Sequence, residues 1–324
     1  MTFWIKSAKK FCLALSVVLA MPLAGHADYP ERPIIAVVPF DVGGGADIFA
    51  RLVSPFIANA LGGTIVIENK PGAGGNLGMQ QVAQARPDGY RILINGMGNI
   101  FNPAVFRNMG FDPLKDLLPV AQIAEYSVAI TIGTHVPANT LSEFVALLKA
   151  NPGKYNGASG GIPNLLALRL FAIENDVKFE VIPYRSSGEG TTAILKGDVD
   201  FIITDGTSSM AGVAAGKLRN LAVTTEIRAS SFPDVPTTKE AGMPNYLIPG
   251  VYGLYVPAGT PPDIVAKLNA AIAKAVESDE LKARFKTLGL MFKHRSSEDF
   301  SNMVRGEIER WKEVARRGNI KPID

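Results

Sequence analysis

Residues 34–56 decide the fold, and they read IIAVVPFDVGGGADIFARLVSPF. The apolar run from Ile34 to Val38 predicts a buried strand, and three glycines at 43–45 follow it closely. Behind the glycines, Ile48 and Leu52 recur at helical spacing. A strand, a glycine loop and a helix start together expose unpaired N–H groups and the positive end of the helix dipole. Such a loop is expected to bind an anion.

Two common phosphate motifs do not fit this loop. The pattern G-x-G-x-x-G would need a glycine where Ile48 stands, and the Gly-Lys-Ser/Thr of a P-loop occurs nowhere in the chain. The loop therefore disfavours a nucleotide and leaves a carboxylate or another small anion. An ordinary strand-to-helix turn with Asp47 as its cap is an open alternative, because aspartate is a preferred N-cap residue.

The N-terminus has the pattern of an export signal. Lysines precede an apolar run from Phe11 to Leu23, and Gly25-His26-Ala27 has small residues where a signal peptidase reads them. We therefore expect residues 1–27 to be a signal peptide, cleaved after Ala27, and the mature protein to be periplasmic. A retained N-terminal anchor is the alternative, although the run is short for a membrane span.

Charge and cysteine content exclude several classes of function. The formal net charge of +3 comes from the three lysines of the predicted signal, whose removal leaves 30 basic and 30 acidic side chains. A neutral mature chain gives no support to nucleic-acid binding. Cys12 is the only cysteine, and the mature histidines His135 and His294 are far apart, so we expect no disulfide, no metal site and no cofactor.

The pattern of strand, loop and helix repeats along the chain. In the first block, a glycine loop at 71–76 and another at 95–99 follow predicted strands. In the second block, predicted strands lead to loops that begin at Ser159, Tyr184 and Asp205. Alternating strands and helices predict parallel sheets, whose ligands bind at the carboxyl ends of the strands. Two such blocks predict two α/β lobes with a cleft between them.

Two matching segments look like the connections between the blocks. Residues 136–140 read VPANT and residues 256–260 read VPAGT, and each separates an apolar run from a helical pattern. We interpret them as two crossovers. Thr140 and Glu143 form a capping box at the first of these helices. The last helix has Trp311 and other apolar residues on one face, which predicts core packing.

Taken together, these stretches resemble a known family, the periplasmic solute receptors of tripartite tricarboxylate transporters, also called Bug proteins. The resemblance covers nearly the whole mature chain and depends on many motifs in the same order. These motifs are YPERPI, VPFDVGGGADIFAR, VIENKPGAGGNLG, ARPDGYRIL, Asn102-Pro103, IPYRSSGEG, LKGDVDFI, AGKLRNLAV, DVPTTKEAG, GLYVPAGTPPDIVAKLN and GNIKPID.

The resemblance implies an α/β type II periplasmic binding protein fold of two Rossmann-like lobes, joined by two crossover segments around a ligand cleft. It places lobe 1 at 28–130 and 253–324, and lobe 2 at 131–252. It implies a monomeric receptor, not an enzyme, that captures a small organic carboxylate and delivers it to the membrane permease subunits of the transporter. Ordered waters and glycine-loop backbone often hold the ligand in this family.

The resemblance also indicates which residues contact the ligand. The first loop matches the family motif at Phe40, Gly44, Gly45, Ala46 and Asp47, and we expect Ser159, Gly160, Tyr184 and Asp205 to complete the site from lobe 2. Asp47 would accept a hydrogen bond from the ligand or a bound water. Four places depart from the family pattern: Ala46 replaces a hydroxyl residue, Val42 replaces a proline, 162–165 (IPNL) replaces a serine turn with a histidine, and Asp205 stands where many members have an Asp-Asn pair.

Two further possibilities stay open. Arg185 is a candidate counter-charge for the ligand, although exposed arginines are common. Residues 157–161 read GASGG and fit G-x-S-x-G, which would make Ser159 the nucleophile of a secreted esterase. Such an esterase would need an acid such as Asp205 and a base from His135 or His294.

Overall fold

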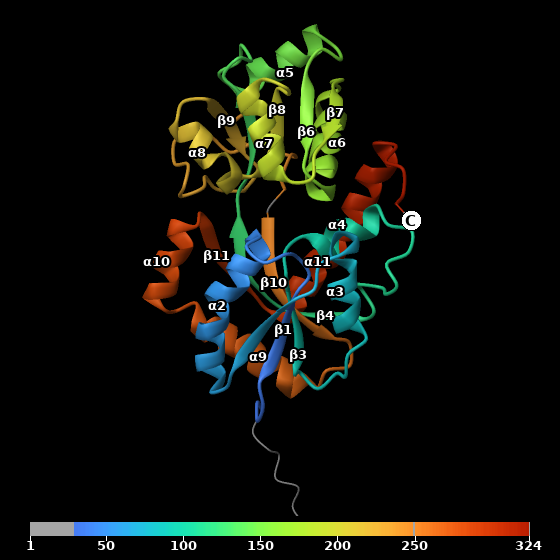
Figure 1. The fold of residues 1–324 in the computed structure, drawn as a ribbon, viewed down its shortest axis with the longest axis vertical. Helices are drawn as coiled ribbons and strands as arrows, with labels where there is room; N and C mark the ends of the chain where they lie inside the picture. The colour runs from blue at the N-terminus through green and yellow to red at the C-terminus, as the bar shows by residue number, and fades with distance from the viewer. Residues whose placement is uncertain (1–28, 249, 324) are drawn as a thin grey trace, which may run out of the picture. The chain divides into compact units, whose positions relative to one another are not determined.

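The computed structural model describes residues 29–248 and 250–323. The predicted signal peptide and its cleavage site lie outside the described residues. Residues from Arg32 onward form one compact unit with two β-sheets, each flanked by helices (Figure 1). None of the helices in the described ranges is both long and apolar enough to cross a bilayer.

The first sheet has six strands in the order β11-β4-β10-β3-β1-β2. Its strands are β1 (Ile34–Val38), β2 (Ile65–Asn69), β3 (Arg91–Asn95), β4 (Leu117–Tyr126), β10 (Gly250–Pro257) and β11 (Leu290–Arg295). Strand β1 pairs in parallel with β2 and β3, as the βαβ pattern predicts, whereas β10 runs antiparallel to β3 and β4. The helices that follow its strands are α2 (Gly45–Leu61), α3 (Asn76–Ala83), α4 (Gly98–Phe101), α9 (Pro262–Ala275), α10 (Asp279–Thr287) and α11 (Ser297–Arg317).

The second sheet has five strands in the order β7-β6-β8-β5-β9. Its strands are β5 (Val128–Gly133), β6 (Asn156–Ser159), β7 (Glu180–Pro183), β8 (Phe201–Asp205) and β9 (Leu218–Val223). Its helices are α5 (Leu141–Ala150), α6 (Ile162–Asn175), α7 (Ser187–Lys196) and α8 (Met210–Ala214). Strand β6 is parallel to β7 and β8, but β5 is antiparallel to β8 and β9. Both sheets are therefore mixed. The chain enters the second sheet through β5 and returns to the first through β10, and each of these strands runs antiparallel to its neighbours.

The chain changes sheet at two places that differ from our expectation. Strand β4 of the first sheet ends at Tyr126, and β5 of the second sheet begins at Val128. The return occurs between β9 and β10. The predicted crossovers at 136–140 and 256–260 are therefore wrong, since each follows a strand that already belongs to the sheet it leads to. The capping box is confirmed, because Thr140 Oγ1 accepts a hydrogen bond from the Glu143 N–H at 3.2 Å.

The outgoing segment between β4 and β5 and the returning segment before β10 are bonded to each other. We call this region the hinge. Tyr126 pairs with Gly250, where an added Cβ would lie 2.1 Å from the Tyr126 ring, so that only glycine fits. On the second-sheet side, the Thr224 N–H donates to Val128 O at 2.8 Å, and Thr224 Oγ1 donates to Ile248 O at 2.8 Å. One fully buried threonine thus holds the outgoing and the returning chain together.

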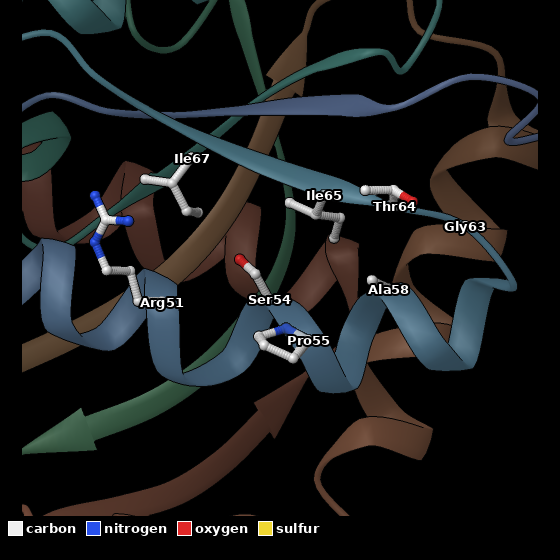
Figure 2. A pocket seen from close by; sticks show the side chains of 8 residues that line it. All are labelled: Arg51, Ser54, Pro55, Ala58, Gly63, Thr64, Ile65 and Ile67. Atoms are coloured by element: carbon white, nitrogen blue, oxygen red, sulfur yellow. The ribbon is translucent and has the colours of Figure 1, made fainter.

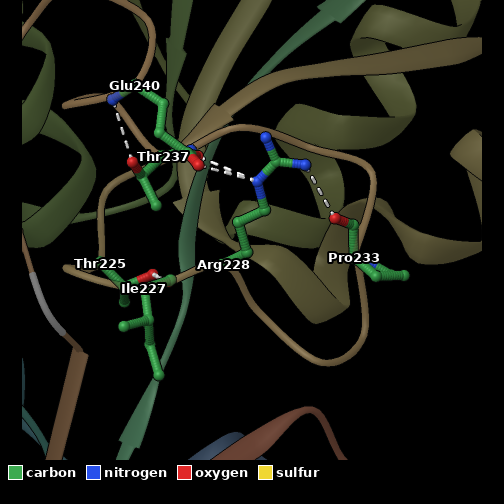
Figure 3. Close-up of polar contacts among 6 residues, drawn as sticks. All are labelled: Thr225, Ile227, Arg228, Pro233, Thr237 and Glu240. Atoms are coloured by element: carbon green, nitrogen blue, oxygen red, sulfur yellow. Dashed lines mark hydrogen bonds and ion pairs between the residues drawn. The ribbon is translucent and has the colours of Figure 1, made fainter.

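The return segment, residues 224–248, consists of turns that side chains hold in place (Figure 3). Arg228 Nε lies 3.0 Å from Glu240 Oε2, and Arg228 Nη1 donates to Pro233 O at 3.1 Å. Glu240 in turn accepts from the Thr237 N–H at 2.7 Å. These bonds give the segment a definite path to β10 without a regular helix.

The apolar face predicted for the last helix is confirmed as core. Phe300, Val304, Ile308 and Trp311 of α11 are at most 1% exposed. Trp311 meets Phe101 edge to face, with ring centroids 4.8 Å apart. The same helix also packs against α6 of the second sheet. It therefore stabilises the first lobe and contacts the second.

Candidate functional site

The first glycine loop presents free amide donors. Helix α2 begins at Gly45 after the N-cap Gly44, and Gly43 has a φ of +83° that favours glycine. Within the described residues, the N–H groups of Gly45, Ala46 and Asp47 have no hydrogen-bond acceptor. An added Cβ at Gly45 would lie 2.8 Å from Tyr252 Oη, so side-chain atoms are excluded there. The positive end of a long helix is left open to an anion.

Asp47 is held inside the protein. Its carboxylate accepts hydrogen bonds from the Gly43 N–H at 2.9 Å and from Asn69 Nδ2 at 2.9 Å, and Arg51 Nε lies 2.9 Å from Oδ1. Asn69 Nδ2 also donates to Phe40 O at 3.0 Å. Asp47 is 2% exposed, and its contact with a ligand stays a prediction. These bonds hold the first glycine loop against the end of β2, and we call them the brace.

The brace makes Asp47 strongly acidic. The hydrogen bond from Arg51 is the main cause that lowers the pKa of Asp47 from 3.8 to about 2, and the bonds from Gly43 and Asn69 lower it further, whereas burial acts in the opposite direction. Because the pKa is lower in the folded state, the charged form stabilises the fold above pH 4, and this stabilisation is lost as the pH falls toward 2.

An Asp47→Asn variant is therefore expected to lower the free energy of unfolding at pH 7 by about 1–2 kcal/mol, a figure reduced for the half-exposed Arg51. Urea unfolding at pH 7 and pH 3 measures the effect, and the gap between variant and wild type should shrink at pH 3. Asp41→Asn on the same loop is the control, because Asp41 is exposed. Equal pH dependence in the two variants would contradict the brace.

The second glycine loop is surrounded by apolar side chains. It contains the 3₁₀ turn η1 (Ala73–Gly75), in which Gly74 and Gly75 have positive φ. An added Cβ at Gly75 would meet the Phe40 ring at 3.3 Å. One at Gly74 would meet the Phe106 ring at 3.4 Å and Ile162 Cδ1 at 3.5 Å. Ile162 begins α6 of the second lobe, so the two lobes contact each other at this loop.

The third glycine loop, at 95–99, is buried, although it follows a strand end as the first two loops do. Asn95 and Asn99 are at most 1% exposed, and a Cβ at Gly96 would meet the Tyr252 ring at 3.3 Å. The Asn95 and Asn99 side chains are hydrogen-bonded to each other. The hinge strand β10 covers this loop, and the sequence pattern of the loop gave no sign of that cover.

The loop after β6 uses its polar groups internally. Ser159 is 6% exposed, and its Oγ donates to Gly161 O at 3.1 Å. A Cβ at Gly160 would lie 2.2 Å from backbone atoms of Ser186 and Ser187, so the next loop packs directly on this glycine. The Tyr184 N–H donates to Ser159 O at 2.7 Å. The Tyr184 ring packs on the apolar cluster beneath α7.

Asp205 lies at the hinge. It ends β8 opposite Val128, and its Oδ2 accepts from Ser208 Oγ at 2.8 Å. Burial, followed by the charge of Asp205, raises the pKa of Tyr126 above its usual value. Burial also raises the pKa of Tyr252, with Tyr126 and Asp205 as further causes.

The hinge tyrosines connect Asp205 to the first glycine loop. The Tyr126 and Tyr252 ring centroids are 4.9 Å apart, and Tyr252 stacks on Phe49 of α2 at 4.3 Å. Sequence reasoning missed both tyrosines. The only available signal was an aromatic residue near each change of sheet, and the positions of those changes were themselves mispredicted.

The structure does not assemble the esterase alternative. His135 Nε2 lies 3.3 Å from Asp200 Oδ1, just before β8, whereas Ser159 stands at the carboxyl end of the parallel strand β6. His294 belongs to β11 of the first sheet. Neither described histidine accompanies Ser159. In the described part of the chain there is also no cluster of His, Cys, Asp and Glu side chains that could hold a metal ion.

Arg185 is exposed on the loop before α7. Its backbone N–H donates to Glu189 Oε2 at 2.9 Å, which closes the start of that helix. The loop follows β7, the edge strand of the second sheet, and β6 separates it from β8 and Asp205. Its role as a counter-charge stays a prediction.

A separate open groove of about 500 Å³ lies between α2 and β2 (Figure 2). Pro55, Ala58 and the side chains of Ile65 and Ile67 give it mainly apolar walls. Its guanidinium, from Arg51, is already bound to Asp47 and donates to Asn69 Oδ1 at 3.0 Å. The groove therefore offers no uncommitted cation for an anionic ligand.

Two α/β lobes between which the chain passes twice are the architecture of solute-binding proteins. Residues 49–320 match the family model described as the tripartite tricarboxylate transporter family receptor. The chain belongs to this family.

Curated and solved relatives agree with this assignment. A UPF0065 protein of Bordetella pertussis is 32% identical over 314 residues, which cover 96% of this chain and 97% of the relative. The solved structure of Rpa4515 from R. palustris with adipate is 31% identical, with a TM-score of 0.80 over 91% of this chain and 100% of that one. MatC from Rhodopseudomonas palustris with bound malate is 32% identical, with a TM-score of 0.76 over 88% and 99%.

Proposed function

We propose that this protein is a periplasmic receptor that captures a small organic carboxylate between its lobes and delivers it to the permease of a tripartite tricarboxylate-type transporter. The observation that carries the proposal is the open start of α2, where the amides of Gly45, Ala46 and Asp47 have no acceptor in the described part of the protein. Relatives of similar size bind adipate and malate, which have the carboxylate such a site would take.

The hinge supports a mechanism of capture by closure. Only Ser127 separates β4 from β5, so a small change of backbone angles there would turn one lobe against the other. Thr224 keeps the two passages together during such a movement. In this proposal the first-lobe amides and bound waters hold the carboxylate, and the loops at Ser159, Gly160, Tyr184 and Asp205 close over the rest of the ligand.

The output of this mechanism is binding and release rather than turnover. Ser159 Oγ donates to a backbone carbonyl of its own loop, and neither described histidine is placed to take its proton. We therefore expect no labelling of Ser159 by a fluorophosphonate. We further propose that the receptor is a monomer that binds no nucleic acid.

A thermal-shift screen tests the proposal. The mature protein would be heated with mono-, di- and tricarboxylates, aromatic acids and acidic amino acids. A true ligand at 100 times its Kd should add about 2.7 kcal/mol of stability and raise the Tm by several degrees. Neutral amides of the same acids are the matched controls, because they lack the charge. A protein that no carboxylate stabilises, or that the amides stabilise equally, would refute the proposed function.

A further inference from the structure

We propose that the hydroxyl group of Tyr252 donates a hydrogen bond to the captured carboxylate, next to the free amides at the start of α2. This role rests on the proposed function, and it adds to the site a residue that sequence reasoning did not predict. Three observations support it: the hydroxyl group lies beside Gly45, no described residue is bonded to it, and its ring is packed in a fixed position.

The Tyr252 hydroxyl group lies beside the amides of the first glycine loop. A Cβ added to Gly45 would lie 2.8 Å from Tyr252 Oη. Gly45 begins α2, and its N–H group, like those of Ala46 and Asp47, has no acceptor in the described part of the chain. A carboxylate offers about four lone-pair directions on its two oxygens. It can therefore accept from these amides and from the phenol at the same time.

The hydroxyl group of Tyr252 is a spare donor. No hydrogen bond among the described residues involves Tyr252 Oη, and the side chain is partly exposed. The carboxylate of Asp205, on the neighbouring strand end of the second lobe, accepts from Thr204 Oγ1 and Ser208 Oγ and not from Tyr252. Burial raises the pKa of Tyr252, so the phenol stays protonated and remains a donor at neutral pH.

The ring of Tyr252 is packed so that its hydroxyl group keeps one position. The ring stacks on Phe49 of α2 with 4.3 Å between the centroids and 12° between the planes, and Tyr126 lies 4.9 Å away. A Cβ added to Gly96 would meet the Tyr252 ring at 3.3 Å. All of these residues belong to the first lobe, so the phenol and the α2 amides stay together when the lobes turn. A donor held in advance costs little ordering entropy on binding.

Calorimetry on Tyr252→Phe tests this role. The probe is the acid of the thermal-shift screen that raises the Tm of the wild type most. We expect the Kd for this acid to rise about ten- to a hundredfold, because a hydrogen bond to a charged group is lost. The Tm of the ligand-free variant should not fall, since the hydroxyl group has no partner in the described protein. Tyr255→Phe is the control and should keep the wild-type Kd, because Tyr255 Oη on the same strand is also unbonded but the side chain is only 1% exposed.

A second substitution tests the position of the hydroxyl group. Gly45→Ala would push a methyl group against Tyr252 Oη and displace it, so this variant should also bind the acid more weakly. The same substitution should cost less affinity in the Tyr252→Phe background, because substitutions of two residues in contact are not additive. Fully additive losses of affinity would overturn the placement of the hydroxyl group beside the amides.

The outcomes separate this role from the proposed function. An equal Kd for the acid in the wild type and in Tyr252→Phe overturns the role and leaves the proposed function standing. An equal loss of affinity in Tyr255→Phe also overturns it, and so does a fall in the ligand-free Tm of Tyr252→Phe, because the hydroxyl group would then act on the fold. If no carboxylate of the screen raises the Tm of the wild type, the proposed function fails and this role fails with it.

Discussion

Replacing Trp311 with alanine is expected to lower the free energy of unfolding by about 3–5 kcal/mol, the usual range for removing a large buried aromatic side chain. Trp311 is fully buried in the middle of α11. Its ring meets Phe101 of the first lobe, and its Nε1 donates to Glu307 Oε2 at 2.9 Å. The substitution would leave a cavity where α11 packs on the first lobe.

Urea unfolding at pH 7 measures this loss, and Lys312→Ala is the matched control. Lys312 is the next residue on the same helix, and its side chain is half exposed and pairs with Glu309 at 2.9 Å. The control should change stability by less than about 0.5 kcal/mol, as exposed ion pairs usually do. A loss below about 1 kcal/mol in Trp311→Ala would contradict the close packing of this core.

The second large effect is expected from Gly160→Ala. The added Cβ would lie 2.2 Å from the Ser186 and Ser187 backbone, and backbone atoms cannot move away as a flexible side chain can. We expect a loss of about 2–3 kcal/mol of stability from overpacking, together with weaker ligand binding, because two loops of the proposed site would be forced apart.

A matched glycine in the same region separates this cause from a general effect of alanine. At Gly188 an added Cβ would approach only Ser186 Oγ, at 3.9 Å, and the residue lies in the first turn of α7. Gly188→Ala should be neutral or slightly stabilising, since alanine favours a helix. Equal Tm values for the two variants, measured by calorimetry, would count against the tight approach of the loops.

Local sequence patterns predicted an element well where the residues of that one segment are enough to indicate it. The strand at 34–38 has the predicted bounds, and β6, β7 and β8 end within a residue of the loops that we expected to begin at Ser159, Tyr184 and Asp205. The capping box at Thr140 was predicted for the right reason, because a cap depends on residues only three positions apart. The strand β4 was not predicted, since it is buried on both faces and has no flanking glycine loop.

The candidate site was predicted only in part. The first loop lies at the start of α2 as expected, but Asp47 is engaged by Arg51 and Asn69, and the third glycine loop is covered by β10. The pair of Asp47 and Arg51 is an i,i+4 contact on α2 that the spacing could have indicated, whereas the bond from Asn69 joins α2 to β2. No spacing along the chain predicts the bond from Asn69 or the cover by β10, because both depend on how the strands are ordered in the sheet.

The sequence by itself determined the alternation of strands and helices, the glycine loops at the strand ends, the apolar face of the last helix and the family. Each depends on periodicity, on turn chemistry or on motifs that are contiguous in the chain. Only the tertiary structure decided where the chain changes sheet, which loop stays open and how Tyr126, Tyr252 and Asp205 meet. Pairing between β4 and β10 decides these features, and it joins segments more than a hundred residues apart whose choice of partner reflects competition among all strands rather than any local preference.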